Sequence, residues 1–320
     1  MEKPVIFVSA PLPGSAIDRL HAAGEVTVGA ASDGVRGEAF AACAPRALAL
    51  VAMLTDRIDA ELLGRAPRLR VVANVAVGVD NVDLDACRAR GVIVTNTPGV
   101  LSEATADLAF GLLVDAARRI SEGDRLVRAG GWTGWSPTLL VGRPVHGAAL
   151  GIVGMGRIGQ AMARRARGFG MRVSYTQRTP LAPELERALG VHSLDVDALF
   201  ASSDFVSLHC PLNDATRGLV SRERLSRMKP GAILVNTARG ACVDEAALAD
   251  ALASGHLGGA GLDVFADEPR VHPALLAVPG VVLAPHIGSA ETATRAAMAE
   301  MAIDGVLAVL SGSDPKHRVA

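Results

Sequence analysis

Short apolar runs rich in β-branched residues alternate with alanine-rich stretches of helical composition along nearly the whole chain. This alternation is typical of βα units, in which helices cover both faces of a parallel sheet. A turn-rich cluster, Asn-Thr-Pro-Gly at residues 96–99, separates two series of such units. The pattern predicts an α/β fold with two Rossmann-like domains, each built on a doubly wound parallel sheet.

The two series differ in length. In the first series the predicted strands are Val5–Val8, Glu25–Val28, Leu48–Leu54, Val71–Ala76 and Val92–Thr95, and the predicted helices include Ala16–Ala23, Ala60–Arg65 and Leu84–Arg90. In the second series six strands are predicted, at Ala149–Val153, Arg172–Tyr175, Phe205–His209, Ala232–Asn236, Gly259–Val264 and Val281–Ala284. One long helix is expected at about Ser102–Arg128, between the series. A last helix, at about Glu291–Leu310, comes too late for the second series, and we expect it to return to the first domain.

Composition excludes several classes of protein. Half of the residues are hydrophobic, which supports a large core, and the net charge of −1 gives no electrostatic reason to bind nucleic acid or an anionic membrane. No apolar run reaches the length of a membrane span, and no signal peptide is apparent. The four cysteines form no CxxC pair and no zinc-type spacing with histidine. We therefore expect no metal site, free thiols and a cytoplasmic location.

A GxGxxG pattern follows the first strand of the second series. Its residues are Gly154, Met155, Gly156, Arg157, Ile158 and Gly159. The three glycines allow a tight turn, the close approach of a pyrophosphate to the backbone, and close packing of helix on strand. The N-terminus of the following helix offers free N–H groups and a positive dipole to phosphate. This context predicts a dinucleotide-binding loop.

The end of the next strand indicates which dinucleotide binds. Enzymes that bind NAD place an Asp or Glu here, on the ribose hydroxyls. This chain has no carboxylate at that point and offers Thr176, Arg178 and Thr179 instead. A basic residue with small hydroxyl residues suits a 2′-phosphate, so the sequence predicts a preference for NADPH, with NADH as the alternative.

Three ionisable residues follow three strands of the second series. Arg239 follows Ala232–Asn236, and Glu268 and His286 follow the next two strands. Because ligands bind at the carboxyl ends of strands in open α/β sheets, we expect these side chains to lie at the same edge as the glycine loop.

Their chemistry fits the reduction of a 2-keto acid. A nicotinamide supplies the hydride, and His286 can donate a proton near neutral pH. Glu268 can hydrogen-bond to the imidazole and favour its charged form. The guanidinium of Arg239 can hold a carboxylate.

These residues lie within motifs that resemble those of the D-isomer-specific 2-hydroxyacid dehydrogenases, in their glyoxylate/hydroxypyruvate reductase branch. The resemblance covers roughly Val71 to Ser289. The motifs are residues 74–81 (NVAVGVDN), 97–107 (TPGVLSEATAD), the glycine loop, 236–240 (NTARG), 261–269 (GLDVFADEP) and 285–289 (PHIGS).

The resemblance implies roles for these residues. Arg239, Glu268 and His286 are the catalytic trio, with His286 as the acid/base. The backbone N–H groups of Val77 and Gly78 hold the substrate carboxylate, and Asp263 binds the nicotinamide carboxamide. The coenzyme is further lined by Cys210, Pro211, Thr237, Ala238 and Gly288. The resemblance also implies a split substrate domain (1–99 and 288–320) around a central dinucleotide-binding domain (100–287).

The resemblance further implies a homodimer, in which residues 98–147 reach across a two-fold axis and Trp135 approaches the partner's active site. Local packing of Trp132 and Trp135 is the alternative. The expected activity is reduction of glyoxylate, hydroxypyruvate or a similar short 2-keto acid to a D-2-hydroxy acid. Other members of the family (D-lactate, 2-ketogluconate or phosphite enzymes) and a nucleotide-sensing corepressor on the same scaffold remain as alternatives.

Overall fold

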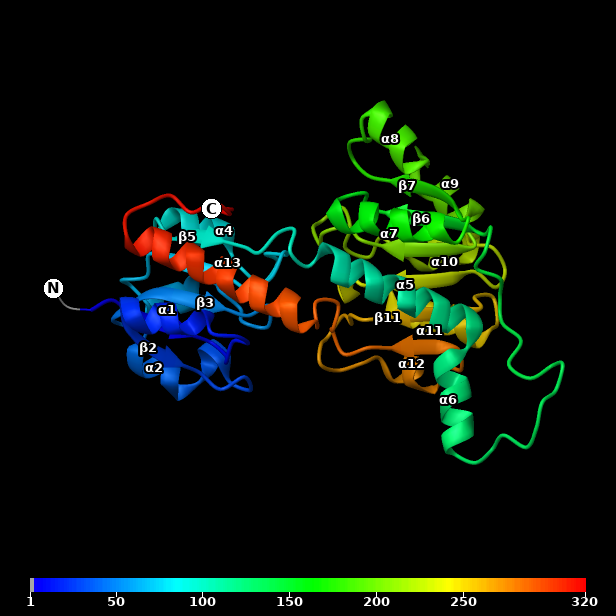
Figure 1. Cartoon of the computed structure of the whole chain (residues 1–320), viewed down its shortest axis with the longest axis horizontal. Helices are drawn as coiled ribbons and strands as arrows, with labels where there is room; N and C mark the ends of the chain where they lie inside the picture. Colours follow the sequence, from blue (N-terminus) through cyan, green and yellow to red (C-terminus); the bar gives the residue numbers. More distant parts are fainter. Residues whose placement is uncertain (1–2) are drawn as a thin grey trace. The chain divides into compact units, whose positions relative to one another are not determined.

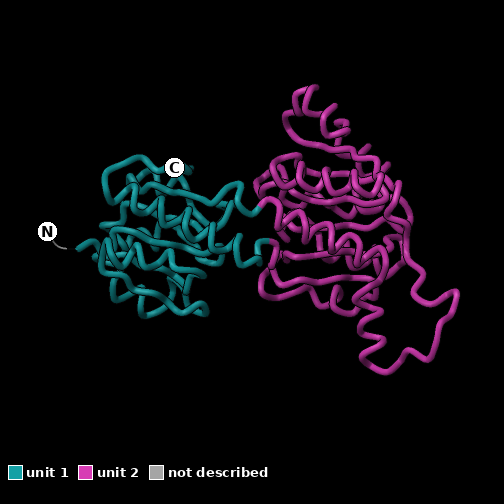
Figure 2. Tube along the Cα trace, in the orientation of Figure 1, with its two compact units in different colours: residues 1–101, 289–320 teal, residues 102–288 magenta. Residues whose placement is uncertain are grey.

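The computed structural model describes residues 3–320 and contains two compact units. Unit 1 consists of the chain up to Leu101 together with Ser289–Ala320, and unit 2 is Ser102–Gly288 (Figure 2). Each unit is built on its own parallel sheet flanked by helices (Figure 1). The α/β class with two parallel sheets, predicted from the alternating pattern, is confirmed.

Unit 1 holds a five-stranded sheet in the order β2-β1-β3-β4-β5. The strands are β1 (Val5–Val8), β2 (Glu25–Val28), β3 (Ala47–Ala52), β4 (Val71–Asn74) and β5 (Ile93–Thr95). The helices that connect them are α1 (Ala16–Ala23), the 3₁₀ turn η1 (Gly34–Arg36), α2 (Glu38–Cys43), α3 (Ala60–Arg65) and α4 (Leu84–Ala89). Asp59 and Asp83 accept hydrogen bonds from Leu62 N–H and Ala86 N–H and so cap α3 and α4.

The last helix, α13 (Thr292–Leu310), packs on the sheet of unit 1 as expected. Ala299, Ala302 and Ile303 are buried in the same apolar cluster as the strand residues Val51 and Ala73. The small alanine side chains let the helix approach the sheet closely. The chain therefore leaves unit 1, builds unit 2 and comes back.

Unit 2 holds a seven-stranded sheet in the order β12-β11-β10-β9-β6-β7-β8, with every pair parallel. Its strands are β6 (Ala149–Val153), β7 (Arg172–Thr176), β8 (Val191–Ser193), β9 (Phe205–Leu208), β10 (Ile233–Asn236), β11 (Gly259–Leu262) and β12 (Val281–Leu283). The prediction of six strands was wrong because β8 was missed. This edge strand has three residues, and two of them, His192 and Ser193, are polar and exposed, so it has no apolar run.

Helices cover both faces of this sheet. The helices of unit 2 are α5 (Ser102–Arg118), α6 (Ile120–Arg128), α7 (Arg157–Gly168), α8 (Pro183–Leu189), α9 (Val196–Ser202), α10 (Arg222–Arg227), η2 (Gly240–Cys242), α11 (Glu245–Ala253) and α12 (Pro273–Ala277). One apolar cluster joins α5, α7 and α8 to the sheet, and the other joins α9, α10, α11 and α12. Neighbouring strand residues alternate between them, Ile152 with the first cluster and Val153 with the second.

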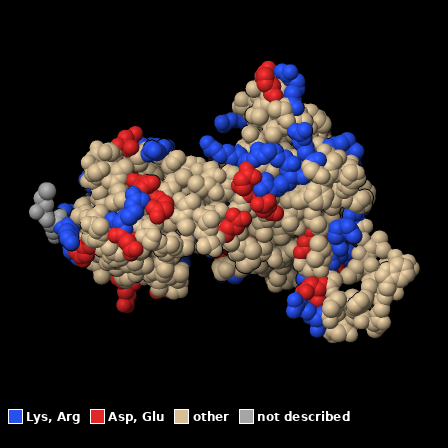
Figure 3. Space-filling model, in the orientation of Figure 1, with Lys and Arg blue, Asp and Glu red and all other residues tan. Residues whose placement is uncertain are grey.

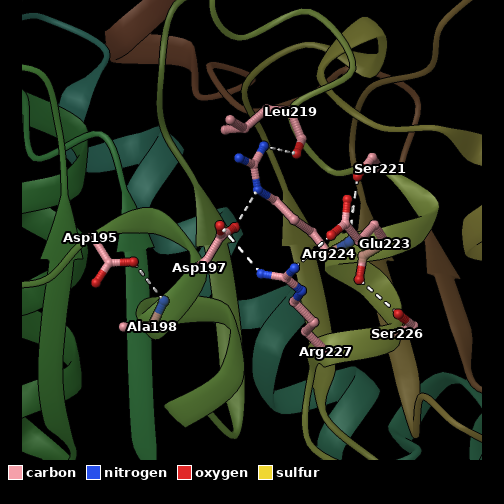
Figure 4. A network of polar contacts seen from close by, with 9 residues as sticks. All are labelled: Asp195, Asp197, Ala198, Leu219, Ser221, Glu223, Arg224, Ser226 and Arg227. Atoms are coloured by element: carbon pink, nitrogen blue, oxygen red, sulfur yellow. Dashed lines mark hydrogen bonds and ion pairs between the residues drawn. The ribbon is translucent and has the colours of Figure 1, made fainter.

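An ion-pair network joins two of the helices that pack in the second apolar cluster. Asp197 of α9 lies 2.9 Å from Nε of Arg224 and 3.3 Å from Nη1 of Arg227, both on α10 (Figure 4). These side chains are partly exposed, so solvent screens the pairs and their contribution to stability is small.

The long helix expected at Ser102–Arg128 is two helices. Arg119 adopts a left-handed conformation (φ 56°), which ends α5 at Arg118 and lets α6 leave in a new direction (Figure 1). The carboxylate of Asp115 accepts hydrogen bonds from the N–H and the hydroxyl of Ser121 and holds the break. The helical composition of the stretch concealed the break because Arg, Ile and Ser are all acceptable within a helix.

Within residues 3–320 no helix has both the length and the apolarity that crossing a bilayer requires.

Candidate active site

The glycine loop joins β6 to the N-terminus of α7, at the point where the strand order of the sheet reverses. Gly154 has a φ of +94°, and a Cβ there would lie 2.7 Å from the backbone N of Cys210. A Cβ at Gly159 would overlap the carbonyl oxygen of Gly154. Both glycines are therefore required by backbone packing inside the unit itself.

Gly156 differs from these two glycines. A Cβ there would meet no atom of the described residues within 4 Å, so packing inside the protein does not explain this glycine. It stands directly before α7, whose first N–H groups have no carbonyl of a preceding turn to bond to. Open space, a free helix N-terminus and a bare backbone together suit a phosphate group, so the loop fits a dinucleotide.

The end of β7 is tied to this loop by a residue that the sequence analysis did not single out. The Gln177 side chain accepts a hydrogen bond from Met155 N–H (3.1 Å) and donates one to the carbonyl of Thr179 (2.6 Å). Arg178 and Thr179 are exposed beside it. Glu186 of α8 hydrogen-bonds to the Tyr175 hydroxyl at 2.6 Å.

His286 and Glu268 form a hydrogen-bonded pair. Nδ1 of His286 lies 2.8 Å from Oε2 of Glu268, and Oε1 of Glu268 accepts a hydrogen bond from Phe265 N–H at 3.0 Å. Burial opposes the ionisation of Glu268, but these hydrogen bonds and the nearby charge of Arg239 outweigh it, so the pKa of Glu268 lies below its ordinary value. About a quarter of each side chain stays exposed (25% for His286, 29% for Glu268), so a ligand can reach the pair.

The turn that carries His286 is held by a buried carboxylate. Asp263, 1% exposed, accepts hydrogen bonds from Ile287 N–H (2.7 Å) and Gly288 N–H (2.8 Å). The N–H of His286 donates to the Asp263 carbonyl, and His286 itself has a φ of +53°. Burial raises the pKa of Asp263.

Arg239 follows β10, the neighbour of β11. Asn236 fixes this turn, since its side chain accepts from Ala238 N–H (3.0 Å) and donates to the Arg239 carbonyl (2.9 Å). A Cβ at Gly240 would overlap the backbone of Phe265, so only glycine lets the Arg239 turn pack against the loop that carries Glu268. The structure thus brings Arg239, Glu268 and His286 to one edge of the sheet of unit 2.

The remaining coenzyme residues predicted in unit 2 also follow strands of its sheet. Cys210, Thr237 and Ala238 are buried, and the hydroxyl of Thr237 has no hydrogen-bond partner among residues 3–320. Pro211 follows Cys210 and is exposed. A hydrogen bond to Cys242 and burial raise the pKa of the Cys210 thiol, which is therefore neutral.

His209, to which the sequence analysis gave no role, directly follows β9 (Phe205–Leu208) at this edge. Its Nε2 is 2.9 Å from the Ser207 hydroxyl, and burial lowers the pKa of His209 to about 4, so the imidazole is neutral at pH 7.

Val77 and Gly78 belong to unit 1, in a bend after β4. The strand ends at Asn74 and not at Ala76 as predicted, because the backbone turns at Val75 and Ala76 N–H bonds back to the Asn74 carbonyl. The carbonyls of Val77 and Gly78 accept hydrogen bonds from the Asn96 and Asn74 side chains.

The part of the chain that the structure describes holds no group of three or more His, Cys, Asp or Glu side chains arranged to bind a metal ion.

Comparisons with known proteins agree with this geometry. Residues 110–288 match the family model of the D-isomer specific 2-hydroxyacid dehydrogenase NAD-binding domain. The chain is 46% identical over 317 residues to the glyoxylate reductase of Thermococcus onnurineus, a match that covers 98% of this chain and 95% of the relative.

Solved structures of two other proteins are also similar to this chain. A protein from Thermus thermophilus is similar with a TM-score of 0.91 and 49% identity, over 99% of this chain and 100% of the other. The NADPH-dependent glyoxylate/hydroxypyruvate reductase of Sinorhizobium meliloti, solved with NADP and malonate, is similar with a TM-score of 0.87 and 34% identity, over 100% of this chain and 97% of the other. With a glycine loop fit for a dinucleotide and an Arg–Glu–His group at the same sheet edge, the chain belongs to the D-isomer-specific 2-hydroxyacid dehydrogenase family.

Proposed function

We propose that this protein is an NADPH-dependent reductase that converts glyoxylate, hydroxypyruvate or a similar short 2-keto acid into the D-2-hydroxy acid. The observation that carries the proposal is the 2.8 Å hydrogen bond between Nδ1 of His286 and Glu268, at the same sheet edge as the glycine loop. The similarity to glyoxylate reductases over nearly the whole chain supports the substrate class.

In this proposal unit 2 holds the coenzyme and unit 1 is the substrate domain. The glycine loop and the N-terminus of α7 hold the pyrophosphate, and Cys210, Pro211, Thr237, Ala238, Asp263 and Gly288 line the rest of the coenzyme. The backbone N–H groups of Val77 and Gly78, together with the guanidinium of Arg239, hold the substrate carboxylate. A cytoplasmic location belongs to the same proposal and is supported by four unpaired cysteines.

The chemistry then divides between coenzyme and protein. When bound, the nicotinamide coenzyme supplies the hydride. Because Nδ1 of His286 is engaged by Glu268, Nε2 is the nitrogen that can donate a proton to the substrate oxygen. The ionised Glu268 stabilises the imidazolium before the transfer and keeps the ring oriented.

The first test is activity itself. The purified protein should oxidise NADPH with glyoxylate and hydroxypyruvate, and His286→Ala should lower kcat by about 10²–10⁴-fold because it removes the proton donor. NADPH binding, followed by fluorescence titration, should stay within about twofold of wild type. His192→Ala, a surface histidine bonded to Ser174, is the matched control. No turnover of any 2-keto acid by the wild type would refute the proposed function.

The Glu268–His286 pair makes a pH prediction. Glu268→Gln removes the negative charge that lies 2.8 Å from Nδ1 of His286 and stabilises the imidazolium. In keto-acid reduction, which needs the protonated donor, the falling limb of kcat/KM against pH should move to lower pH. Asp267→Asn, on the same loop but paired with Arg270, should leave the profile in place. An unmoved profile in Glu268→Gln contradicts the pairing.

We further propose that NADPH is preferred over NADH. Arg178 is exposed beside Thr179 at the end of β7, and no carboxylate stands at residues 176–179 to repel a 2′-phosphate.

Arg178→Ala should lower the ratio of kcat/KM for NADPH to that for NADH by about tenfold, as expected for the loss of one charged hydrogen bond. Arg187→Ala, an exposed arginine on α8 paired with Glu184, is the control. A wild type that strongly prefers NADH would reject the coenzyme proposal while leaving the reductase proposal intact.

We also propose a homodimer. Residues 129–142 carry no charge, and most of their large apolar side chains are exposed, with Trp135 at 83% and Val141 at 66%. This arm, residues 129–142, projects beyond α6, and its surface shows no charged side chain in the face drawn (Figure 3). Together with the exposed Ile120 and Val127 of α6, it is apolar surface of the kind that marks a protein interface. In the dimer Trp135 approaches the partner's active site.

Trp135→Ala should therefore weaken dimerisation and raise the KM for the keto acid, because the side chain contributes to both. Sedimentation velocity at several protein concentrations and steady-state kinetics measure the two effects. Leu276→Ala removes another exposed apolar side chain (63%) outside the arm and should change neither. Unchanged dimerisation and KM in Trp135→Ala would mean that the tryptophan packs only locally.

A further inference from the structure

The bend that follows β4 has its carbonyl groups fixed one after another. The carbonyl of Ala76 accepts a hydrogen bond from Thr97 N–H at 2.9 Å. The carbonyl of Val77 accepts one from Nδ2 of Asn96 at 2.8 Å. The carbonyl of Gly78 accepts one from Nδ2 of Asn74 at 2.9 Å. Three successive peptide groups are thus held by donors outside the bend.

Fixing these carbonyls also fixes the N–H groups. In a planar trans peptide the N–H points opposite to the carbonyl of the preceding residue. The Ala76 carbonyl therefore orients the N–H of Val77, and the Val77 carbonyl orients the N–H of Gly78. Both carbonyls face the adjacent residues Asn96 and Thr97, so both N–H groups point away from that segment, to the same side.

These two N–H groups are available to a ligand. Within residues 3–320 neither of them donates a hydrogen bond to a protein acceptor. Val77 is 37% exposed, so water or a small molecule can reach the bend. Two neighbouring N–H groups that point to one side form a concave donor site for an anion such as a carboxylate.

We infer that Asn96 is a positioning residue that sets the preference of the enzyme for substrates with a carboxylate. Its amide holds the Val77–Gly78 peptide so that the Gly78 N–H is directed at the substrate before binding. This inference rests on the proposed role of Val77 and Gly78. Without the Asn96 amide this peptide loses the hydrogen bond that orients it, and ordering it at binding costs affinity.

Asn96 can be tested separately from the rest of the network. Asn74 is fully buried and bonds reciprocally to Asn81 at 3.1 Å, so replacing it removes several bonds of unit 1 at once. The Asn96 side chain is only partly buried, and its own N–H bonds to the His317 carbonyl, a contact that a substitution of the side chain keeps.

The experiment compares wild type, Asn96→Ala and Asn96→Asp. The aspartate has the same shape but, when ionised, cannot donate to the Val77 carbonyl. Asp59→Ala, which removes the cap of α3 in the same unit, is the control for a loss of stability of similar size. The readouts are KM for glyoxylate and for NADPH, the Kd of oxamate for the coenzyme-saturated enzyme, and kcat/KM for methylglyoxal, a carbonyl compound without a carboxylate.

Both Asn96 variants should raise the KM for glyoxylate and the Kd of oxamate by about tenfold, the effect of losing one hydrogen bond. KM for NADPH should stay within about twofold, and the ratio of kcat/KM for glyoxylate to that for methylglyoxal should fall. Asp59→Ala should lower the urea midpoint without moving these constants.

Variants with unchanged constants, or with equal losses on glyoxylate and methylglyoxal, would overturn the inference, since a merely structural role affects both substrates alike. If Asn96→Ala does not fold, Asn96→Asp alone decides between these outcomes. A wild type that neither reduces glyoxylate nor binds oxamate would instead refute the proposed function, and the two failures are distinguishable.

Discussion

The buried carboxylate of Asp263 holds the turn that carries His286, at the sheet edge of unit 2 where Arg239 and Glu268 also lie. Asp263 accepts the N–H groups of Ile287 and Gly288, and its carbonyl accepts that of His286, so the chain after β12 is folded back onto the end of β11. This turn holds His286 in a left-handed conformation that a free chain would seldom adopt. The contact between His286 and Glu268 depends on that turn, because it fixes the position of the imidazole.

Backbone contacts at glycines bring the other parts of the site close. Gly154 lies against the backbone after β9, Gly159 against Gly154, and Gly240 against the loop that carries Glu268. A Cβ at any of these three glycines would lie too close to the neighbouring backbone atoms. The glycine loop and the Arg239 turn are therefore held in place by backbone packing. Gly156 differs, because a Cβ there would meet no atom of residues 3–320 within 4 Å, so internal packing does not require this glycine.

Loops of unit 1 are also fixed by specific contacts, which are made by side-chain amides and not by glycines. Asn74, Asn81 and Asn96 donate to carbonyls in the loops after β3 and β4 and thereby fix peptide planes that no helix or strand constrains. Loops that carry function need such support, since their backbone groups have no regular partners. Amides suit the task because each can donate and accept without a charge.

The sequence by itself determined the two βα series, the return of the last helix, the glycine loop and the positions of Arg239, Glu268 and His286. These follow from local signals: apolar periodicity, glycine spacing, and polar residues directly after strands. It did not reveal the edge strand β8, which is too short and polar, or the break at Arg119, where composition favours helix.

Only the tertiary structure decided that Gln177 ties the glycine loop to the end of β7 and that Asn96 orients the bend at Val77. Each of these hydrogen bonds joins residues that lie far apart in the chain. Neither apolar periodicity nor residue spacing shows which group an Asn or Gln side chain will bond to. Its role therefore depends on which loops the folded sheet brings together.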